Sequence, residues 1–198
     1  MIEFSNLSNL APYKIFKQEY EKATLANQSN IEAACISSYS NEIKEVNARF
    51  VNLKIIDQNE FIFFSNYEST KSREFLNHAQ ISASIFWSST NFQIRMKANI
   101  KKTSTEFNNL YFAKRDKKKN ALAISSKQSS KIKSYESIEE NYKESLANSN
   151  LEKCPDYWGG YSFTPYYFEF WEGDDNRLNK REVYEKNDNN WNQHFLQP

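Results

Sequence analysis

Only three of the 198 residues are glycine, at positions 159, 160 and 173, and this scarcity limits the folds that the chain can adopt. The loops that wrap a dinucleotide or a nucleoside triphosphate need several glycines where the backbone approaches the phosphates. Neither loop can be built from these three positions. Any phosphate bound by this chain must therefore be held mainly by side chains such as Arg, Lys, Ser and Gln.

One segment in the middle of the chain has a clear strand pattern. From Phe92 to Ile100, apolar residues alternate with polar ones, which is typical of a strand with one buried and one polar face. The stretch 27–47 is ambiguous, although its apolar centre at 31–38 fits a buried strand. Two hairpins are expected, one around a turn at 57–59 and one around 172–180. The strands of the first hairpin are expected over residues 48–56 and 60–65, and those of the second over 166–171 and 182–186. A further strand is expected over 81–87, paired with 92–100.

Helical spacing of apolar residues predicts helices between and around these strands. Residues 12–26 should form an amphipathic helix that begins near a proline, and 69–77 a shorter one. Two capping boxes, at 103–106 and 137–140, open further helices. The lysine-rich run 114–119 is expected to be a solvated turn or a gate for a phosphate, and loops are expected at 125–134 and 155–160. Short antiparallel strands with helices at the edges predict a mainly β (α+β) fold, a small closed or split barrel.

Composition argues against several classes of function. The 26 basic and 25 acidic residues nearly cancel, so the chain as a whole has no excess charge that favours nucleic acid. The cysteines, Cys35 and Cys154, lie far apart and indicate reduced thiols in a cytoplasmic protein. The two histidines are too few and too separated for a metal site. The start of the chain lacks signal-peptide features, and no window has the roughly 20 apolar residues of a membrane helix.

Long cations stand at fixed spacing beside strand-forming or aromatic residues in two places. Arg49 and Lys54 lie in the strand expected over 48–56, where residues at i and i+5 point to opposite faces. They should therefore face apart, or diverge at the end of the strand, and could serve two separate anions. Near the end of the chain Trp171, which can cover a flat ring, precedes Arg177 and Arg181. The ligand that these residues imply is planar, aromatic and phosphorylated.

The chain also carries an ordered series of motifs. They are Ala-Arg-Phe-Val-Asn-Leu-Lys at 48–54, Phe-Phe-Ser-Asn-Tyr-Glu-Ser-Thr-Lys at 63–71, Tyr-Phe-x-x-Arg at 111–115, Ser-Lys-Gln-Ser-Ser at 126–130, Trp-Gly-Gly at 158–160, Glu-Phe-Trp at 169–171 and Arg-Leu-x-x-Arg at 177–181. In this order they resemble the pyridoxamine 5′-phosphate oxidase family, which is built on an FMN-binding split β-barrel. The resemblance runs from residue 48 to the end, roughly three quarters of the chain.

The resemblance implies a single domain over 1–198, with an N-terminal helical segment at 1–27 and a dimerisation and substrate segment at 155–198. It implies a homodimer with FMN at the interface, and neither nucleic acid nor a membrane as a partner. In the family, the positions of Trp171 and Arg181 reach the flavin from the second subunit. The residues that match the family's FMN contacts are Arg49, Phe50, Val51, Lys54, Phe64, Ser65, Thr70, Lys71, Gln93, Gln128, Ser129, Trp171 and Arg181.

The resemblance also implies a substrate site. Its residues are Lys54, Tyr111, Arg115, Lys119, Arg177 and Asn179. Lys54, Tyr111 and Arg115 would hold the substrate phosphate and Arg177 would lie over the pyridine ring, so Arg177 and Asn179 are the catalytic candidates. Tyr111 and Arg115 are four apart, which places them on one face of a helix. Taken singly, such residues are more often surface cations or core aromatics, and only the ordered set favours the site.

The chain departs from the family pattern at several positions. Asn179 stands where the family has a histidine, and an asparagine can donate a hydrogen bond but cannot titrate near neutral pH. The other departures are Thr70 for an arginine, Lys119 for a serine of the substrate-phosphate site, Asp116 for a proline and Ala98 for a glycine. The nearby Arg73 could compensate for the arginine missing at Thr70. FMN binding is therefore better supported than normal turnover.

The expected function is FMN-dependent oxidation of pyridoxamine 5′-phosphate and pyridoxine 5′-phosphate to pyridoxal 5′-phosphate, with O2 as acceptor and H2O2 as by-product. The first alternative is a related flavoenzyme with another substrate, such as the family's phenazine-pathway branch, which Asn179 and Lys119 favour. A non-enzymatic binder of FMN or pyridoxal phosphate would bind tightly without flavin reduction. A basic nucleic-acid module would bind RNA or DNA with strong salt dependence and would be colourless.

Overall fold

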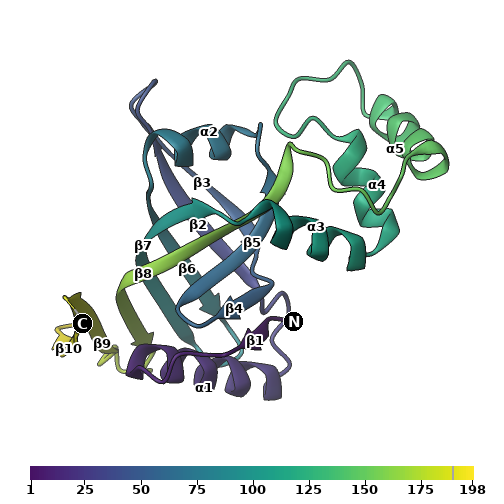
Figure 1. The fold of residues 1–198 in the computed structure, drawn as a ribbon. Coiled ribbons are helices and arrows are strands. Elements are labelled where there is room, and N and C mark those ends of the chain that lie inside the picture. Colours follow the sequence, from purple (N-terminus) through teal and green to yellow (C-terminus); the bar gives the residue numbers. More distant parts are fainter. Residues whose placement is uncertain (189) are drawn as a thin grey trace.

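The computed structural model of the chain describes residues 1–188 and 190–198 (Figure 1). Within this part, ten strands form one sheet in the order β1-β4-β5-β8-β7-β6-β2-β3, and β9 pairs with β8 and β10. The strands are β1 (Glu3–Ser5), β2 (Ala33–Ser40), β3 (Glu45–Asn52), β4 (Ile55–Asp57), β5 (Glu60–Asn66), β6 (Gln80–Trp87), β7 (Phe92–Lys102), β8 (Trp158–Glu172), β9 (Lys180–Asn187) and β10 (Asn190–Leu196). The helices are α1 (Ala11–Leu25), α2 (Thr70–Asn77), α3 (Thr105–Lys114), α4 (Lys117–Ser125) and α5 (Glu136–Asn148). The fold is mainly β with flanking helices, as the sequence predicts.

A hydrophobic cluster fills the space inside the curved sheet, and α1 lies across one end of it (Figure 1). Tyr13, Phe16 and Tyr20 of α1 are buried at helical spacing. The ring of Phe16 lies edge-on to the ring of Phe61 in β5, with centroids 5.0 Å apart, and to that of Trp87 in β6 at 5.8 Å. Because burial of each such ring contributes about 1.5–3 kcal/mol, α1 is held firmly against both halves of the sheet.

The strand predicted from alternation is confirmed. Along β7, Ile94 and Met96 are fully buried, whereas Arg95 and Lys97 are exposed. The ambiguous stretch 27–47 contains β2, in which Ala34 and Ile36 are fully buried.

The single strand expected over 48–56 is wrong. The chain pairs with β2 up to Asn52 and with β5 from Ile55 onward. The Leu53 N–H donates to the Glu32 carbonyl oxygen at 2.9 Å, and the Lys54 N–H donates to the Ile62 carbonyl oxygen at 2.8 Å. The backbone therefore exchanges one partner strand for another between two adjacent residues. A continuous strand-like sequence carries no signal for such an exchange.

Two further expectations about the strands need correction. The sheet is not wholly antiparallel, because β1 runs parallel to β4. The loop expected at 155–160 ends early, because β8 begins at Trp158 and passes through both glycines while pairing with β5. A Cβ on Gly159 would lie 2.2 Å from the Tyr67 hydroxyl oxygen, so the absence of a side chain there permits close packing.

The helix starts differ from the predicted capping boxes. Ser104 caps α3, since its Oγ accepts a hydrogen bond from the Phe107 N–H at 3.2 Å. Thr103, the predicted cap, instead donates to Oδ1 of Asn108 at 2.6 Å. The second box, at 137–140, does not form, because α5 begins earlier and has no side-chain cap.

The lysine-rich run 114–119 is not a turn throughout. The helix α4 begins within it at Lys117, behind Asp116 as the N-cap residue. The Oδ1 atom of Asp116 accepts a hydrogen bond from the Lys119 N–H at 3.0 Å. A cap at this position overcomes three consecutive lysines in the first turn, where positive charge opposes the helix dipole.

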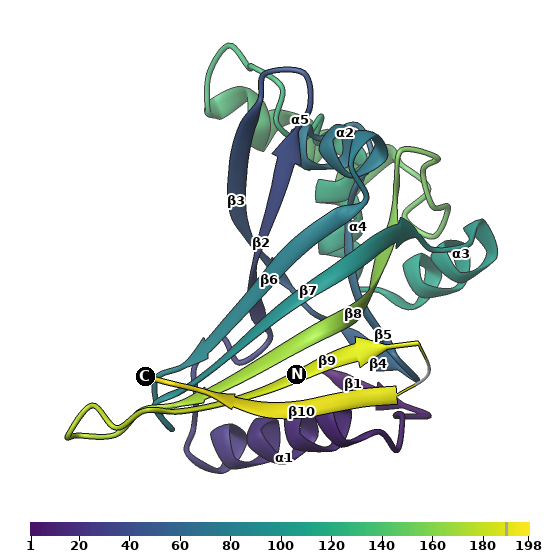
Figure 2. The same ribbon diagram turned by 90° about the vertical axis from the view of Figure 1, so that its left-hand side faces the viewer.

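The outer face of β2, β6, β7 and β8 has no helix over it (Figure 2). Val46 and Phe50 of β3 and Phe86 of β6 are 71%, 75% and 55% exposed. The strand registers and the alternation of side chains put all three on this outer face. Among the described helices, none has the length and apolar character needed to cross a membrane.

Candidate functional site

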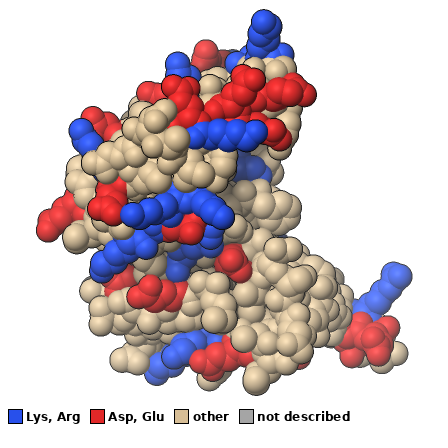
Figure 3. Space-filling view, turned by 90° about the vertical axis from the view of Figure 1, so that its right-hand side faces the viewer, with Lys and Arg blue, Asp and Glu red and all other residues tan. Residues whose placement is uncertain are grey.

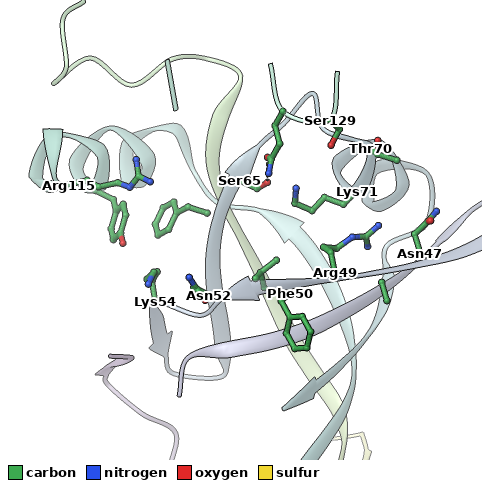
Figure 4. Close-up of a pocket in the computed structure, with 15 residues that line it drawn as sticks. Asn47, Arg49, Phe50, Asn52, Lys54, Ser65, Thr70, Lys71, Arg115 and Ser129 are labelled. Atoms are coloured by element: carbon green, nitrogen blue, oxygen red, sulfur yellow. Dashed lines mark hydrogen bonds between the residues drawn. The ribbon is translucent and has the colours of Figure 1, made fainter. Parts of the chain in front are cut away.

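A cavity of about 550 Å3 lies between β3, β5, the N-terminal turn of α2, the C-terminal end of α3 and the loop after α4 (Figure 4). Cationic side chains stand at both of its ends. Arg49 and Lys71 lie toward one end, whereas Lys54 and Arg115 lie toward the other (Figure 4). The full lining is Asn47, Ala48, Arg49, Phe50, Val51, Asn52, Lys54, Phe64, Ser65, Thr70, Lys71, Tyr111, Arg115, Gln128 and Ser129.

The first cationic end is organised by a buried carboxylate. Glu74 of α2 is only 4% exposed, and its Oε2 accepts a hydrogen bond from Nη2 of Arg49 at 2.9 Å. The same carboxylate accepts a hydrogen bond from Nδ2 of Asn47 at 2.8 Å and another from the Ser38 hydroxyl. The ion pair with the buried Glu74 carboxylate thus fixes the direction of the Arg49 guanidinium. Arg49 still lines the cavity.

Lys71 is the second cation at this end. It is 7% exposed, and its Nζ donates to the Ser69 hydroxyl oxygen at 3.1 Å. Burial, with the nearby positive charge of Arg49, lowers the pKa of Lys71 to about 8. An anion in the cavity would relieve both effects, because it would favour the charged form of the amine.

Neutral hydrogen-bonding groups complete this end. Oε1 of Gln128 accepts from the Ser65 hydroxyl at 3.1 Å and from the Asn66 N–H at 3.3 Å, which ties the loop after α4 to β5. Ser129 follows with a left-handed backbone, φ 71°, and also borders the cavity. Such a conformation is uncommon outside glycine and is often found at binding sites.

The second cationic end is built by α3, α4 and the segment before β4. Nζ of Lys54 lies 3.5 Å from Oε1 of Glu32. Nη1 of Arg115 donates to Oδ1 of Asn120 at 3.0 Å, and the guanidinium lies 5.1 Å from the ring centroid of Trp158. Burial lowers the pKa of Arg115, but a guanidinium remains charged at neutral pH.

Two stacked aromatic rings also line the cavity. Phe64 of β5 lies parallel to Tyr111 of α3, with centroids 3.7 Å apart and planes 13° from parallel. Phe64 also stacks with Trp158, with ring centroids 5.1 Å apart, and with Phe107, with ring centroids 6.1 Å apart. Burial raises the pKa of the Tyr111 hydroxyl, so it stays protonated and can donate a hydrogen bond at neutral pH.

Comparisons with known proteins give the family. A family model described as the pyridoxine 5′-phosphate oxidase C-terminal dimerisation region matches residues 158–198. The pyridoxine/pyridoxamine 5′-phosphate oxidase of Colwellia psychrerythraea is 33% identical over 194 residues, which is 96% of this chain and 88% of that protein. The chain belongs to the pyridoxine/pyridoxamine 5′-phosphate oxidase family. The oxidase of Christiangramia forsetii is 34% identical over 192 residues, covering 94% of this chain and 88% of that protein.

Solved structures share the family's split-barrel fold. PhzG from Burkholderia lata, crystallised with tetrahydrophenazine-1-carboxylic acid, superposes with a TM-score of 0.89 at 24% identity and covers 94% of this chain and 92% of its own. An FMN-binding, pyridoxamine 5′-phosphate oxidase-related protein from Nostoc punctiforme has a TM-score of 0.78 at 13% identity, covering 96% and 100%. At these identities the likeness establishes the fold.

The cavity brings together many of the residues singled out from the sequence. From β3 and the segment after it come Arg49, Phe50, Val51 and Lys54, from β5 Phe64 and Ser65, from α2 Thr70 and Lys71, from α3 and its C-cap Tyr111 and Arg115, and from the loop after α4 Gln128 and Ser129. Arg49 and Lys54 both line this one cavity, so they do not point to opposite faces of one strand; Lys54 lies beyond the end of β3, which is the other arrangement that the sequence left open. They stand at its two ends, however, so the expectation of two separate anions is still open.

Other residues of the family pattern lie outside this cavity. Lys119 is exposed on the first turn of α4, and Arg177 and Asn179 lie in the loop between β8 and β9. Gln93, Trp171 and Arg181 are opposite one another across β7, β8 and β9. These three residues therefore form a row on the outer face of the sheet, away from the cavity of their own chain.

Arg181 in this row is held by a buried carboxylate. Glu169 is 2% exposed, and its Oε1 lies 2.9 Å from Nε and 2.8 Å from Nη2 of Arg181. Its Oε2 accepts from Nη1 of Arg95 at 2.9 Å and from the Tyr167 hydroxyl at 2.9 Å. The direction of the Arg181 guanidinium is therefore fixed by contacts within the single chain.

The sequence reading missed several residues at the cavity. Asn47 and Asn52 line it from the same strand as Arg49, and extending that strand in both directions would have found them. Glu74 and Glu32 hold the cations, and Asn120 holds Arg115, but nothing in the sequence pairs them. Arg73, expected to compensate for Thr70, does not line the cavity and donates to the Glu68 carbonyl oxygen at 3.1 Å.

On the face shown in Figure 3, Lys and Arg side chains are interspersed with Asp and Glu side chains. A nucleic-acid site would need a continuous basic stripe. This face does not offer one.

Proposed function

We propose that the chain is an FMN-dependent oxidase that converts pyridoxamine 5′-phosphate and pyridoxine 5′-phosphate to pyridoxal 5′-phosphate. The observation that carries the proposal is one cavity with two separately held cationic ends and two stacked aromatic rings in its lining. A cofactor and a substrate that each carry a phosphate and a flat ring need such a site. Family membership supports the same reading.

The donor set at the first end fits the FMN phosphate. A phosphate dianion needs charge-assisted donors, and the chain's few glycines cannot supply a backbone cradle. Arg49 and Lys71 would pair with the phosphate, and Ser65, Gln128 and Ser129 would hydrogen-bond to it. The lowered pKa of Lys71 supports this assignment, because a buried amine beside a guanidinium gains most from an incoming anion.

The second end would hold the phosphate of the substrate. Lys54 and Arg115 supply positive charge, and Tyr111 supplies a protonated hydroxyl. The partners Glu32 and Asn120 orient these cations without closing the cavity. Two anchors at fixed positions would set where the substrate ring lies, which is the main contribution that a protein makes to a cofactor-driven oxidation.

When bound, FMN supplies the two-electron redox chemistry, with O2 as final acceptor and H2O2 as by-product. The chain's own residues would bind, orient and cover the reactants. In a homodimer, Gln93, Trp171 and Arg181 would reach the ring of the cofactor bound by the other subunit, and Arg177 would lie over the substrate. This arrangement explains why these residues lie outside the cavity of their own chain.

The test is an anaerobic titration of the FMN-loaded protein with pyridoxine 5′-phosphate, followed by visible absorbance. The flavin band should bleach and return on admission of air, with pyridoxal 5′-phosphate appearing. Arg177→Ala should lower kcat/KM by about 100-fold and leave FMN affinity unchanged, because the residue positions only the substrate. Arg73→Ala, which also removes an exposed arginine, is the matched control. Equal loss of oxidation and FMN binding in Arg177→Ala would overturn its role.

A flavoenzyme acting on a carboxylate instead of a phosphate is the second candidate. Lys54 and Arg115 would pair with a carboxylate as well as with a phosphate. A yellow protein that never bleaches with either B6 phosphate, but does so with a reduced phenazine carboxylate, would support this candidate and overturn the first.

A further inference from the structure

The loop between β8 and β9, residues 173–179, is anchored tightly at its base. The Gly173 N–H donates to the Asn91 carbonyl oxygen at 3.0 Å. A Cβ on Gly173 would lie 2.0 Å from Nδ2 of Asn91, so the Asn91 side chain packs directly against the Gly173 backbone. The base of the loop is therefore held against the residue that precedes β7.

One side chain then organises the rest of the loop. Oδ1 of Asp174 accepts from the N–H of Asn176 at 2.9 Å and from the N–H of Leu178 at 3.3 Å. The Asp174 carbonyl oxygen accepts from the Arg177 N–H at 3.0 Å. The Asp174 N–H in turn donates to Oδ1 of Asn179 at 3.1 Å. Four hydrogen bonds on one residue thus close the loop around Arg177.

Arg177 itself has a left-handed backbone, with φ 63°. This conformation is uncommon for residues other than glycine, asparagine and aspartate, and it is enriched in turns and at functional sites. Arg177 is exposed, and its guanidinium has no hydrogen-bond or ion-pair partner among residues 1–188 and 190–198. The hydrogen bonds within the loop thus hold the backbone around Arg177 and leave its guanidinium free to contact a ligand.

We propose that Asp174 and Asn179 are positioning residues that hold Arg177 in this conformation for contact with the phosphorylated pyridine bound by a second subunit. The inference rests on the proposed function and deepens it. It also gives Asn179 a task that a histidine does less well. An amide oxygen accepts the Asp174 N–H at any pH, whereas an imidazole accepts only when neutral and in the right tautomer.

The experiment compares Asp174→Ala with Asp174→Asn in the FMN-loaded protein. The alanine removes the oxygen that accepts from Asn176 and Leu178, whereas asparagine keeps an acceptor in the same place. Asp174→Ala should lower kcat/KM for pyridoxine 5′-phosphate by about 10- to 100-fold, since a small misplacement of a positioned group costs that much. Asp174→Asn should recover most of the loss. Asp175→Ala, which removes the neighbouring exposed carboxylate, is the matched control.

A double variant separates positioning from a direct role. The Asp174 and Asn179 hydrogen bonds that hold the loop are here called the brace. Asp174→Ala combined with Arg177→Ala should be no slower than Arg177→Ala alone, because the brace then has no Arg177 guanidinium to position. FMN affinity should be the same in all variants. Multiplying effects, or an Asp174→Asn variant as slow as Asp174→Ala, would overturn the proposal.

Limited proteolysis reads the brace without any turnover. Trypsin cuts after arginine in extended, mobile segments, so cleavage between Arg177 and Leu178 should be faster in Asp174→Ala and Asn179→Ala than in the unaltered protein. Unchanged cleavage would overturn the brace. Faster cleavage in a protein that oxidises no B6 phosphate would keep the brace and reject the proposed function, so the two failures can be told apart.

Discussion

Lys71 is the residue whose pKa should respond most directly to an anion bound in the cavity. Its pKa lies near 8 instead of its usual 10.5, because it is buried and because Arg49 is close. The amine is therefore charged below pH 8 and increasingly neutral above it. Bound phosphate would restore the charge, so FMN binding should take up a proton near pH 8. FMN affinity should fall by up to about tenfold per pH unit above pH 8, as measured by quenching of flavin fluorescence.

Replacing the amine tests this origin. Lys71→Met should weaken FMN binding by about 10- to 100-fold, the value of a hydrogen bond to a charged group, and should flatten the pH dependence. Arg73→Met, on the same helix but outside the cavity, should leave both unchanged. In the cofactor-free protein the buried charge of Lys71 destabilises the fold below pH 8. The unfolding free energy should rise as pH goes from 8 to 10.5, because the unfolded chain binds more protons in that window and the cost of the buried charge is lost. A Lys71→Met protein with an unaltered pH profile would contradict the assignment.

The residues of the site could be predicted from the sequence where a motif holds them together. Phe64, Ser65 and Lys71 are such a case, since one short segment carries β5, the turn and the start of α2. The buried carboxylates Glu74 and Glu169 could not be predicted in the same way. Glu74 meets Arg49 across the fold, at 25 residues' separation, whereas Glu169 and Arg181 lie 12 residues apart on the neighbouring strands β8 and β9. Residue identity predicts donors, whereas their orientation depends on packing.

At the scale of elements, the spacing of apolar residues predicts those helices and strands that bury one face. The helix α1 and the strand β7 follow from their apolar spacing, because one face of each is buried. The break between β3 and β4 and the early start of β8 do not follow from it. Both depend on which strand is the hydrogen-bonding neighbour, and that choice leaves no periodic trace in the sequence.

The helix α4 links a departure from the family pattern to the second cationic end of the cavity. Asp116 caps α4, and within that helix the fully buried Asn120 accepts from Arg115 and donates Nδ2 to the Phe112 and Leu151 carbonyl oxygens at 2.8 Å each. Asp116→Ala should cost about 1 kcal/mol of unfolding free energy in urea. It should also raise KM for pyridoxine 5′-phosphate several-fold, because fraying of the first turn loosens the partner of Arg115.

Serine at the same position is the matched control. Asp116→Ser keeps an oxygen that can cap the helix, so both the unfolding free energy and KM should stay close to those of the unaltered protein. FMN affinity should not change in either variant, since the phosphate of FMN is assigned to the other end. A stable Asp116→Ala protein with raised KM would mean that the carboxylate contacts the substrate directly.

For the whole molecule, one chain does not contain the complete proposed site. The cavity holds both cationic ends, but the row of Gln93, Trp171 and Arg181 lies on the outer face of the sheet. That face also exposes Phe50 and Phe86, and no helix covers it (Figure 2). The matched family region, 158–198, is described as a dimerisation region and contains part of the same row. Periodicity and composition give no sign that these residues lie outside the cavity, and only the resemblance to the family implies a second subunit.

If the outer face is the dimer interface, a charge placed on it should separate the subunits and empty the site together. Phe86→Glu puts a carboxylate where an apolar ring is 55% exposed in the single chain. Burying that carboxylate unpaired would cost several kcal/mol, so the variant should sediment as a monomer and lose FMN affinity by at least about tenfold. Leu25→Glu, at an exposed apolar residue on α1, should leave both unchanged. A monomer that binds FMN as tightly as the unaltered protein would mean that the partner adds nothing to the cofactor site, and a Phe86→Glu dimer would move the interface elsewhere.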